Sequence, residues 1–161
     1  MPILQYLHFK PDVGRGTELA EDAFVVGKVR MAGPAVIDAS AVLRGDQNWI
    51  WVGPRFRMGA RSTVHVEPTT ETRIGSDVWL GDDVVVHATT LGDGVRVEQG
   101  GLVLSNSRVG AGSIVAPDAL VPEGAEFEAN SYIEGTPGRR TRETTPDERQ
   151  ETLRRVRDAL G

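Results

Sequence analysis

The feature of this sequence that most constrains its fold is an aliphatic residue at every sixth position. The longest run of this period holds one register over Leu91, Val97, Val103, Val109, Val115, Val121, Phe127 and Ile133. Shorter runs precede it, for example Ile74, Leu80 and Val86. A six-residue period matches neither the α-helix, which repeats every 3.6 residues, nor the half-buried strand, which alternates every two. The chain therefore requires a structure whose own repeat is six residues long.

A coil with flat sides meets that requirement. If each hexapeptide forms one side of a triangular coil, the aliphatic residues point inward and successive coils stack on a continuous apolar column. The composition agrees with so narrow a core, because the chain has 19 glycines and only 4 phenylalanines. Glycines such as Gly53 and Gly81 follow inward residues, where they relieve crowding at the corners. We predict an all-β, left-handed parallel β-helix rather than a glycine-rich β-sandwich, whose strands would not keep one register for so long.

The chain divides into three parts around this repeat. With 161 residues it has room for one core. We expect an N-terminal lead-in over 1–22, the left-handed β-helix over 23–138, and a linker with a C-terminal α-helix over 139–161. Thr145 is the predicted N-cap, with Pro146 at the first helical position and Glu148 completing a capping box. Leu153, Val156 and Leu160 form an apolar stripe that is expected to pack against the β-helix or a neighbouring subunit.

Composition limits the possible partners. A net charge of −5 and a pI near 5.2 argue against binding to nucleic acid or an anionic membrane, which need a basic face. Without cysteine, a metal site must use imidazole and carboxylate ligands, and the only histidines are His8, His65 and His87. No apolar run reaches membrane-spanning length and the start of the chain lacks a secretory signal. These features predict a cytoplasmic protein that acts on a small molecule.

The repeat is interrupted twice. Three extra residues separate Leu43 from Val52, after Arg44-Gly45-Asp46, and four separate Val64 from Ile74, directly after His65. A solenoid tolerates insertions as loops that leave a corner, and such loops often carry the functional residues. We therefore look for a site near these two breaks.

Particular residues around the breaks resemble the gamma-class carbonic anhydrase-like family. They are the segments 42–46 (VLRGD) and 50–53 (IWVG), the pair Val64-His65, the segment 74–81 (IGSDVWLG), the pair Val86-His87, and the closing Gly135-Thr136-Pro137 with Arg142. The resemblance extends over roughly Ala23 to Glu148. It implies a homotrimer in which three histidines hold a divalent metal, two from one subunit and one from its neighbour.

The resemblance carries two of these ligands onto His65 and His87, and the third position is occupied by Asp82. Zinc accepts carboxylate oxygen, and two histidines with one carboxylate also suit Fe²⁺. An anionic ligand makes the metal a weaker Lewis acid. The alternative is that Asp82 has abolished the site. Gly59 and Ala60 stand where the family has a Gln-Asp pair, so an amide near the metal-bound solvent is missing.

Other residues of the site are assigned less directly. The resemblance implies an inter-subunit ion pair of Arg44 and Asp46. Gln99 follows Asp82 by the same number of residues that separate Asp82 from His65, so Gln99 can line the same cleft and replace the absent amide. Glu67 is a candidate proton shuttle, although loop glutamates are usually only solvated. The tryptophans either pack or wall a pocket for a substrate larger than carbon dioxide: Trp49, Trp51 and Trp79.

Three functions follow for testing. The first is a metal-dependent lyase that hydrates carbon dioxide or performs a diverged metal-assisted hydration, elimination or cyclisation. The second is a hexapeptide acyltransferase that uses an acyl-coenzyme A donor, with His65 or His87 as general base. The third is a non-catalytic trimeric scaffold. The fold alone does not decide among them, because hexapeptide repeats occur in many enzymes.

Overall fold

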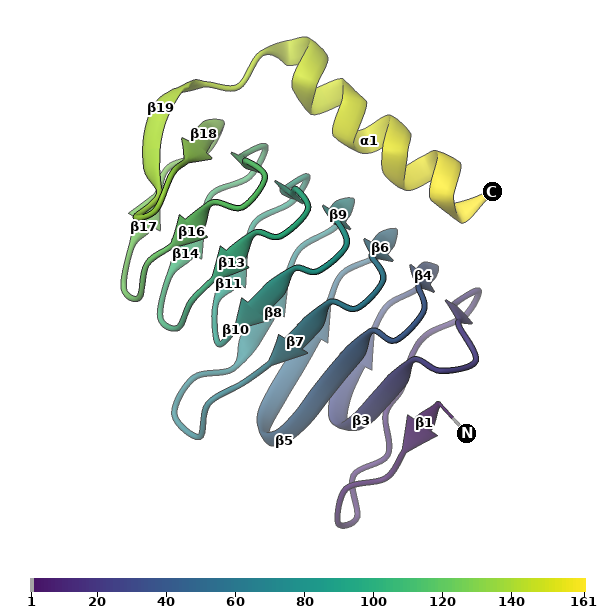
Figure 1. The fold of residues 1–161 in the computed structure, drawn as a ribbon. Coiled ribbons are helices and arrows are strands. Elements are labelled where there is room, and N and C mark those ends of the chain that lie inside the picture. The colour runs from purple at the N-terminus through teal and green to yellow at the C-terminus, as the bar shows by residue number, and fades with distance from the viewer. Residues whose placement is uncertain (1) are drawn as a thin grey trace.

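The computed structural model describes residues 2–161 and consists of a parallel β-solenoid of about 7 turns followed by one helix (Figure 1). This confirms the predicted left-handed β-helix. Each turn contributes one short strand to each of three faces, which we call A, B and C. Equivalent strands of successive turns pair in parallel, so each face is a ladder along the solenoid axis.

Two long strands run around the corner between faces A and B and join them into one 11-stranded sheet, β3 (Phe24–Met31) and β5 (Val42–Val52). Face A otherwise contains β1 (Ile3–Leu4), β7 (Thr63–His65), β10 (Val85–His87), β13 (Leu102–Val103) and β16 (Leu120–Val121). Face B continues through β8 (Thr72–Ile74), β11 (Thr90–Leu91), β14 (Arg108–Val109) and β17 (Glu126–Phe127).

Face C is a separate 8-stranded sheet. Its strands are β2 (Glu18–Leu19), β4 (Ala35–Ile37), β6 (Phe56–Met58), β9 (Val78–Leu80), β12 (Arg96–Val97), β15 (Ile114–Val115), β18 (Ser131–Glu134) and the antiparallel β19 (Arg139–Glu143). Strands β1 and β2 lie within the expected lead-in, and β19 lies within the expected linker. The parallel stacking therefore begins before residue 23, whereas at the other end β19 extends face C by antiparallel pairing with β18.

The core is the inward column that the six-residue period predicts. Its members are buried along the whole solenoid, as at Leu43, Leu80, Val97, Val115 and Ile133. The corner glycines are required for a steric reason: a Cβ at Gly53 would lie 2.7 Å from the carbonyl carbon of Gly75 in the next turn. A side chain at such a corner would push two turns apart.

The two interruptions of the repeat differ in form. Residues 46–49 make a bulge within β5, because Gly27 pairs with Gly45 and Val29 pairs with Ile50. The expected first loop is therefore an extended strand, since backbone pairing continues on both sides of the corner. The second break is a true excursion over 66–71, closed by an antiparallel bridge between Glu67 and Thr70. Both leave the corner between faces A and B.

The C-terminal helix α1 (Pro146–Leu160) lies along face C, where it contacts β9, β6 and β4 (Figure 1). Thr145 and Glu148 form the predicted capping box. The docked side differs from the predicted stripe: Thr152 and Val156 are buried, while Leu153 is 36% exposed. This helix is not long and apolar enough to cross a membrane, and no other helix occurs in residues 2–161.

The Glu148 carboxylate at the start of α1 should make the stability of the fold depend on pH in the acid range. Two hydrogen bonds from Arg142 to Glu148, together with the Thr145 amide, lower the pKa of Glu148 to about 2. A lowered carboxylate pKa adds stability above the unfolded pKa, and this stability is lost as the pH falls towards the folded value. Glu148→Gln should therefore lower the melting temperature at pH 7, with a gap to wild type that narrows below about pH 4. Asp147→Asn is the matched control, and a gap that stays constant down to about pH 3 would contradict the assignment.

Candidate metal centre

His65 and His87 end two neighbouring strands of face A. The parallel register pairs them directly, and their ring centroids are 5.3 Å apart at an interplanar angle of 33°. Each follows a buried valine, Val64 or Val86, and successive side chains of a strand point to opposite sides. Both imidazoles therefore stand outward and half-buried, and the structure brings these two predicted ligands together.

Asp46 orients the first imidazole. His65 Nε2 lies 3.0 Å from Asp46 Oδ1, and because a carboxylate accepts hydrogen bonds, Nε2 carries the proton and Nδ1 keeps its lone pair. Burial acts to raise the pKa of Asp46, but hydrogen bonds from the Gln47 amide and His65 outweigh burial and hold the pKa below its usual value. Asp46 therefore remains an anion beside His65. Arg44 Nε approaches the same carboxylate at 3.4 Å within one chain.

A hydroxyl and a second carboxylate orient the other imidazole. His87 Nδ1 is 2.9 Å from Ser105 Oγ, and Ser105 donates its proton to Glu67 Oε1 at 2.6 Å. The Ser105 oxygen thus accepts from His87, which places the imidazole proton on Nδ1 and leaves a lone pair on Nε2. Metal-binding histidines are typically held in this way, by a partner on the nitrogen that does not face the metal.

The excursion 66–71 is fixed over this pair by contacts with the preceding turn and with the second turn beyond it. Asn48 Nδ2 donates to the carbonyls of Glu67 and Pro68 at 3.3 and 3.2 Å. Thr70 donates to Asn106 at 2.7 Å. These contacts hold Glu67 beside His87, so the predicted proton shuttle lies at the histidine pair.

Asp82 lies elsewhere, at the corner between faces C and A. Its Oδ1 accepts from the Ala60 amide at 2.9 Å and is 3.5 Å from Arg57, which contacts Asp38 more closely, at 2.8 Å. Gln99 is exposed at the same corner in the next turn. Its backbone nitrogen lies against Gly81, where an added Cβ would be 2.8 Å away. Within residues 2–161 of one chain, no three His, Asp or Glu side chains are placed to hold a metal. One chain thus brings His65, His87 and Glu67 together and leaves Asp82 and Gln99 apart from them.

Sequence reasoning missed two residues of this arrangement. It placed Asp46 only in an ion pair with Arg44, whereas the structure shows it against His65, and it did not identify Ser105. A signal for both exists in the repeat, because three hexapeptides make one turn. Ser105 follows His87 by 18 residues, and His65 follows Asp46 by 19. Residues one turn apart are neighbours in a solenoid.

Comparison with known proteins places the chain among relatives. A "Carbonic anhydrase" of Geobacillus kaustophilus is 27% identical over 153 residues, which cover 91% of this chain and 84% of the relative. "Gamma carbonic anhydrase 2, mitochondrial" of Arabidopsis thaliana is 30% identical over 144 residues, 86% of this chain but 52% of the longer plant protein. No family model matches the sequence.

Solved structures agree with the sequence relatives. The crystal structure of a "hexapeptide transferase family protein" from Anaplasma phagocytophilum superposes with a TM-score of 0.93 at 26% identity and covers 98% of this chain and 93% of that chain. The repeat, the paired histidines and these relatives support one assignment. The chain resembles the gamma carbonic anhydrase-like hexapeptide-repeat proteins in both sequence and fold.

Proposed function

We propose that this protein is a metal-dependent lyase of the gamma carbonic anhydrase type. In this proposal His65 and His87 of one subunit and Asp82 of the neighbouring subunit hold a divalent cation, Zn²⁺ or Fe²⁺, in a homotrimer. The observation that carries the proposal is that one ring nitrogen of each imidazole has an oxygen partner within hydrogen-bond distance. Asp46 and the Ser105–Glu67 pair each occupy one ring nitrogen, so His65 and His87 each keep one lone pair for a cation.

The donor set fits such a cation. Two neutral imidazoles and one carboxylate are accepted ligands for zinc and for Fe²⁺. The Asp82 side chain is 40% exposed, and its contacts with Ala60 and Arg57 are made through Oδ1, which leaves Oδ2 available. Arg57 opposes a cation by its charge, but its closer contact is with Asp38.

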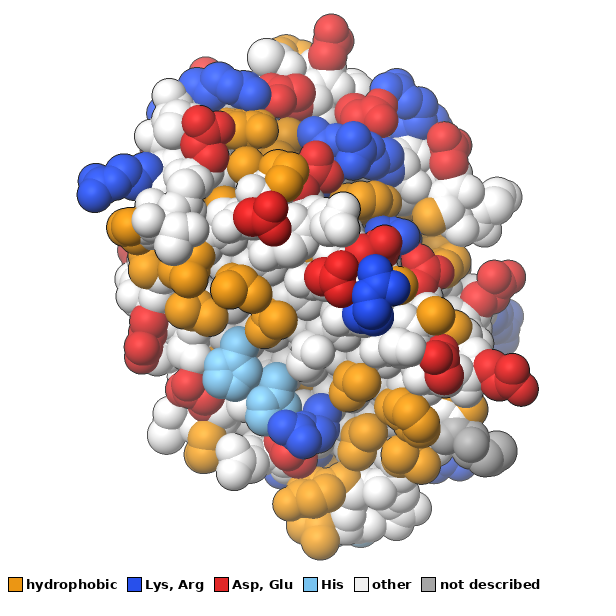
Figure 2. Space-filling model, viewed as in Figure 1, with side chains coloured by type: hydrophobic (Ala, Val, Ile, Leu, Met, Phe, Trp, Pro, Cys, Tyr) orange, Lys and Arg blue, Asp and Glu red, His pale blue; other side chains and the backbone are white. Residues whose placement is uncertain are grey.

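The outer surface of face A supports the trimer. Its outward ladder contains five apolar side chains and one threonine, in paired register: Phe24, Val42, Thr63, Val85, Leu102 and Leu120. Hydrophobic side chains gather on this side of the molecule around two histidines (Figure 2). The ladder lies between the histidine edge of face A and the Asp82 edge. A second copy packed on face A therefore approaches both the histidine pair and Asp82. Arg44 and Asp46 lie at the histidine edge of this face.

The bound cation would act as a Lewis acid and lower the pKa of water, which is the chemistry needed to hydrate carbon dioxide or to assist another hydration, elimination or cyclisation. The chain's own residues do the rest. Asp46 and Ser105 hold the imidazoles in place. Glu67, with 34% of its side chain exposed, carries a proton from the site to bulk water. The carboxylate of Asp82 predicts slower carbon dioxide hydration than a site of three histidines.

Metal analysis combined with a hydration assay tests the proposal. Purified protein should contain about one divalent ion per chain, and Asp82→Asn should reduce that content while Asp82→His retains it and accelerates carbon dioxide hydration. Asp83→Asn, at the neighbouring exposed aspartate, is the control and should leave the metal unchanged. The proposal fails if wild-type protein supplied with zinc and iron binds neither.

An acyl-coenzyme A-dependent acyltransferase is the second candidate. The contact of His65 with Asp46 favours it, because a carboxylate that orients an imidazole is the usual support of a general base. Saturable binding of acetyl-coenzyme A, together with absence of metal, would favour this function. A non-catalytic scaffold would bind neither metal nor acetyl-coenzyme A. Changing His65 and His87 to alanine would then have little effect on the protein.

A further inference from the structure

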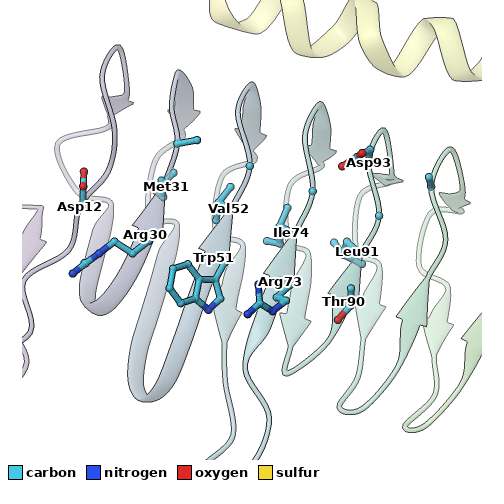
Figure 3. Close-up of a pocket in the computed structure, with 15 residues that line it drawn as sticks. Asp12, Arg30, Met31, Trp51, Val52, Arg73, Ile74, Thr90, Leu91 and Asp93 are labelled. Carbon is cyan, nitrogen blue, oxygen red and sulfur yellow. The ribbon is translucent and has the colours of Figure 1, made fainter.

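A groove of about 710 Å³ follows face B across successive turns of the solenoid, away from the histidines (Figure 3). One wall is a ladder of outward side chains in direct register: Arg30 with Trp51, Trp51 with Arg73, and Arg73 with Thr90. The groove extends to the corner between faces B and C, where Gly53, Gly75 and Gly92 line it. At this corner the groove is lined by the backbone of these glycines together with Ala32, Asp93 and Ala111.

Internal contacts fix the indole of Trp51. Glu71 accepts from Trp51 Nε1 at 2.8 Å through one carboxylate oxygen and from Arg73 Nε at 2.7 Å through the other. Trp49 stacks on Trp51 with ring centroids 5.3 Å apart. The guanidinium of Arg73 also lies over the Trp51 ring, 5.4 Å from its centroid. Together these contacts hold Trp51 in a defined orientation along the groove.

The guanidinium groups on both sides of Trp51 keep free hydrogen-bond donors. Arg73 uses Nε for Glu71, so its two terminal nitrogens remain unpaired within residues 2–161. Arg30 Nη1 donates to the carbonyls of Lys10 and Val29, and its guanidinium lies over the Trp49 ring, 4.9 Å from the centroid. Two carboxylates also line the groove: Asp12, which forms a backbone bridge with Arg30, and Asp93, whose Oδ1 accepts from the Ser76 amide at 2.9 Å. Guanidinium forks favour carboxylate and phosphate groups.

We propose that this groove binds a small organic anion that carries a phosphate or carboxylate on a flat aromatic body. Arg30 and Arg73 take the anionic group from the two sides of Trp51, and the part of the Trp51 indole that lines the groove packs against the ring. The site is separate from the proposed metal centre and uses none of its residues. In a triangular solenoid the B–C corner is opposite face A, so the groove stays open when a second copy covers face A.

Titration calorimetry and tryptophan fluorescence, with phenyl phosphate and benzoate as probes, test the proposal. At least one probe should bind saturably and change the fluorescence, and the tighter one identifies the head group. Arg30→Gln and Arg73→Gln should each weaken that probe about tenfold, the usual effect of losing one charge-assisted hydrogen bond. Arg108→Gln is the matched control because Arg108 is exposed two steps further along the same ladder, outside the groove.

Several results would overturn the site. The first is that neither probe binds at millimolar concentration. The second is that Arg108→Gln weakens probe binding as much as the groove variants do, because this would indicate general attraction to a basic surface. Inorganic phosphate and phenol separate the two halves of the ligand. Inorganic phosphate that binds as tightly as phenyl phosphate would remove the role assigned to Trp51. Unchanged melting temperatures of the exposed arginine variants confirm that the folded protein is compared.

Discussion

Replacing His87 by alanine is expected to weaken zinc binding by more than about 100-fold, because loss of an outer partner of a metal ligand alone costs about 10-fold to 100-fold. Ser105→Ala should give that smaller loss, since it removes the hydrogen bond to His87 Nδ1 without removing a ligand. Affinity is measured by competition with a chromogenic chelator. A loss that is the same for His87→Ala and for His8→Ala, an exposed histidine outside the site, would contradict the assignment.

Mixed trimers of two variants test whether the proposed ion is shared between subunits. His65 and His87 lie at one edge of face A and Asp82 at the other, so two inactive variants can complement each other. Neither Asp82→Ala nor the double variant His65→Ala, His87→Ala should retain tightly bound zinc alone. Refolded together, they should regain zinc at interfaces where intact histidines meet an intact Asp82. If mixtures bind no more zinc than the separate variants, the ion is not shared between subunits.

Phe56→Ala is expected to have the largest effect on stability, a loss of about 3–5 kcal/mol, which is typical of deleting a buried phenyl ring. Phe56 is fully buried in β6 and pairs in register with Ala35 and Val78, so its ring fills space that small neighbours leave. Urea unfolding at one fixed protein concentration measures the change. Phe56→Leu, which refills part of the cavity, should cost clearly less. Equal effects of the two substitutions would show that the turn collapses around the gap.

The fold could be predicted from the sequence because the repeat encodes it directly. A strict register over 91–133 admits few structures, and the corner glycines mark the crowded positions that the close approach of Gly53 to Gly75 confirms. The form of the first interruption could not be predicted. Whether three extra residues leave as a loop or stay paired as the bulge in β5 depends on the neighbouring turn, which a local pattern does not describe.

The candidate site was predictable to a smaller extent. His65 and His87 were assigned by resemblance, and their proximity follows from the repeat because they end equivalent strands. The partners of their ring nitrogens were missed. Asp46 becomes a neighbour of His65, and Ser105 a neighbour of His87, only through the stacking of successive turns. The docked side of α1 was also assigned imprecisely. Thr152 is buried there because a short polar side chain fits closely against the sheet, whereas a search for apolar stripes selects Leu153.

The separation of the histidine pair from Asp82 within one chain has a thermodynamic consequence. An ion that takes all three side chains must bridge chains, so ion affinity depends on how many chains are associated. Linkage requires the reverse as well: the ion strengthens association by the same free energy that association adds to ion binding. At low protein concentration a chelator would then both strip the cation and drive dissociation into single chains.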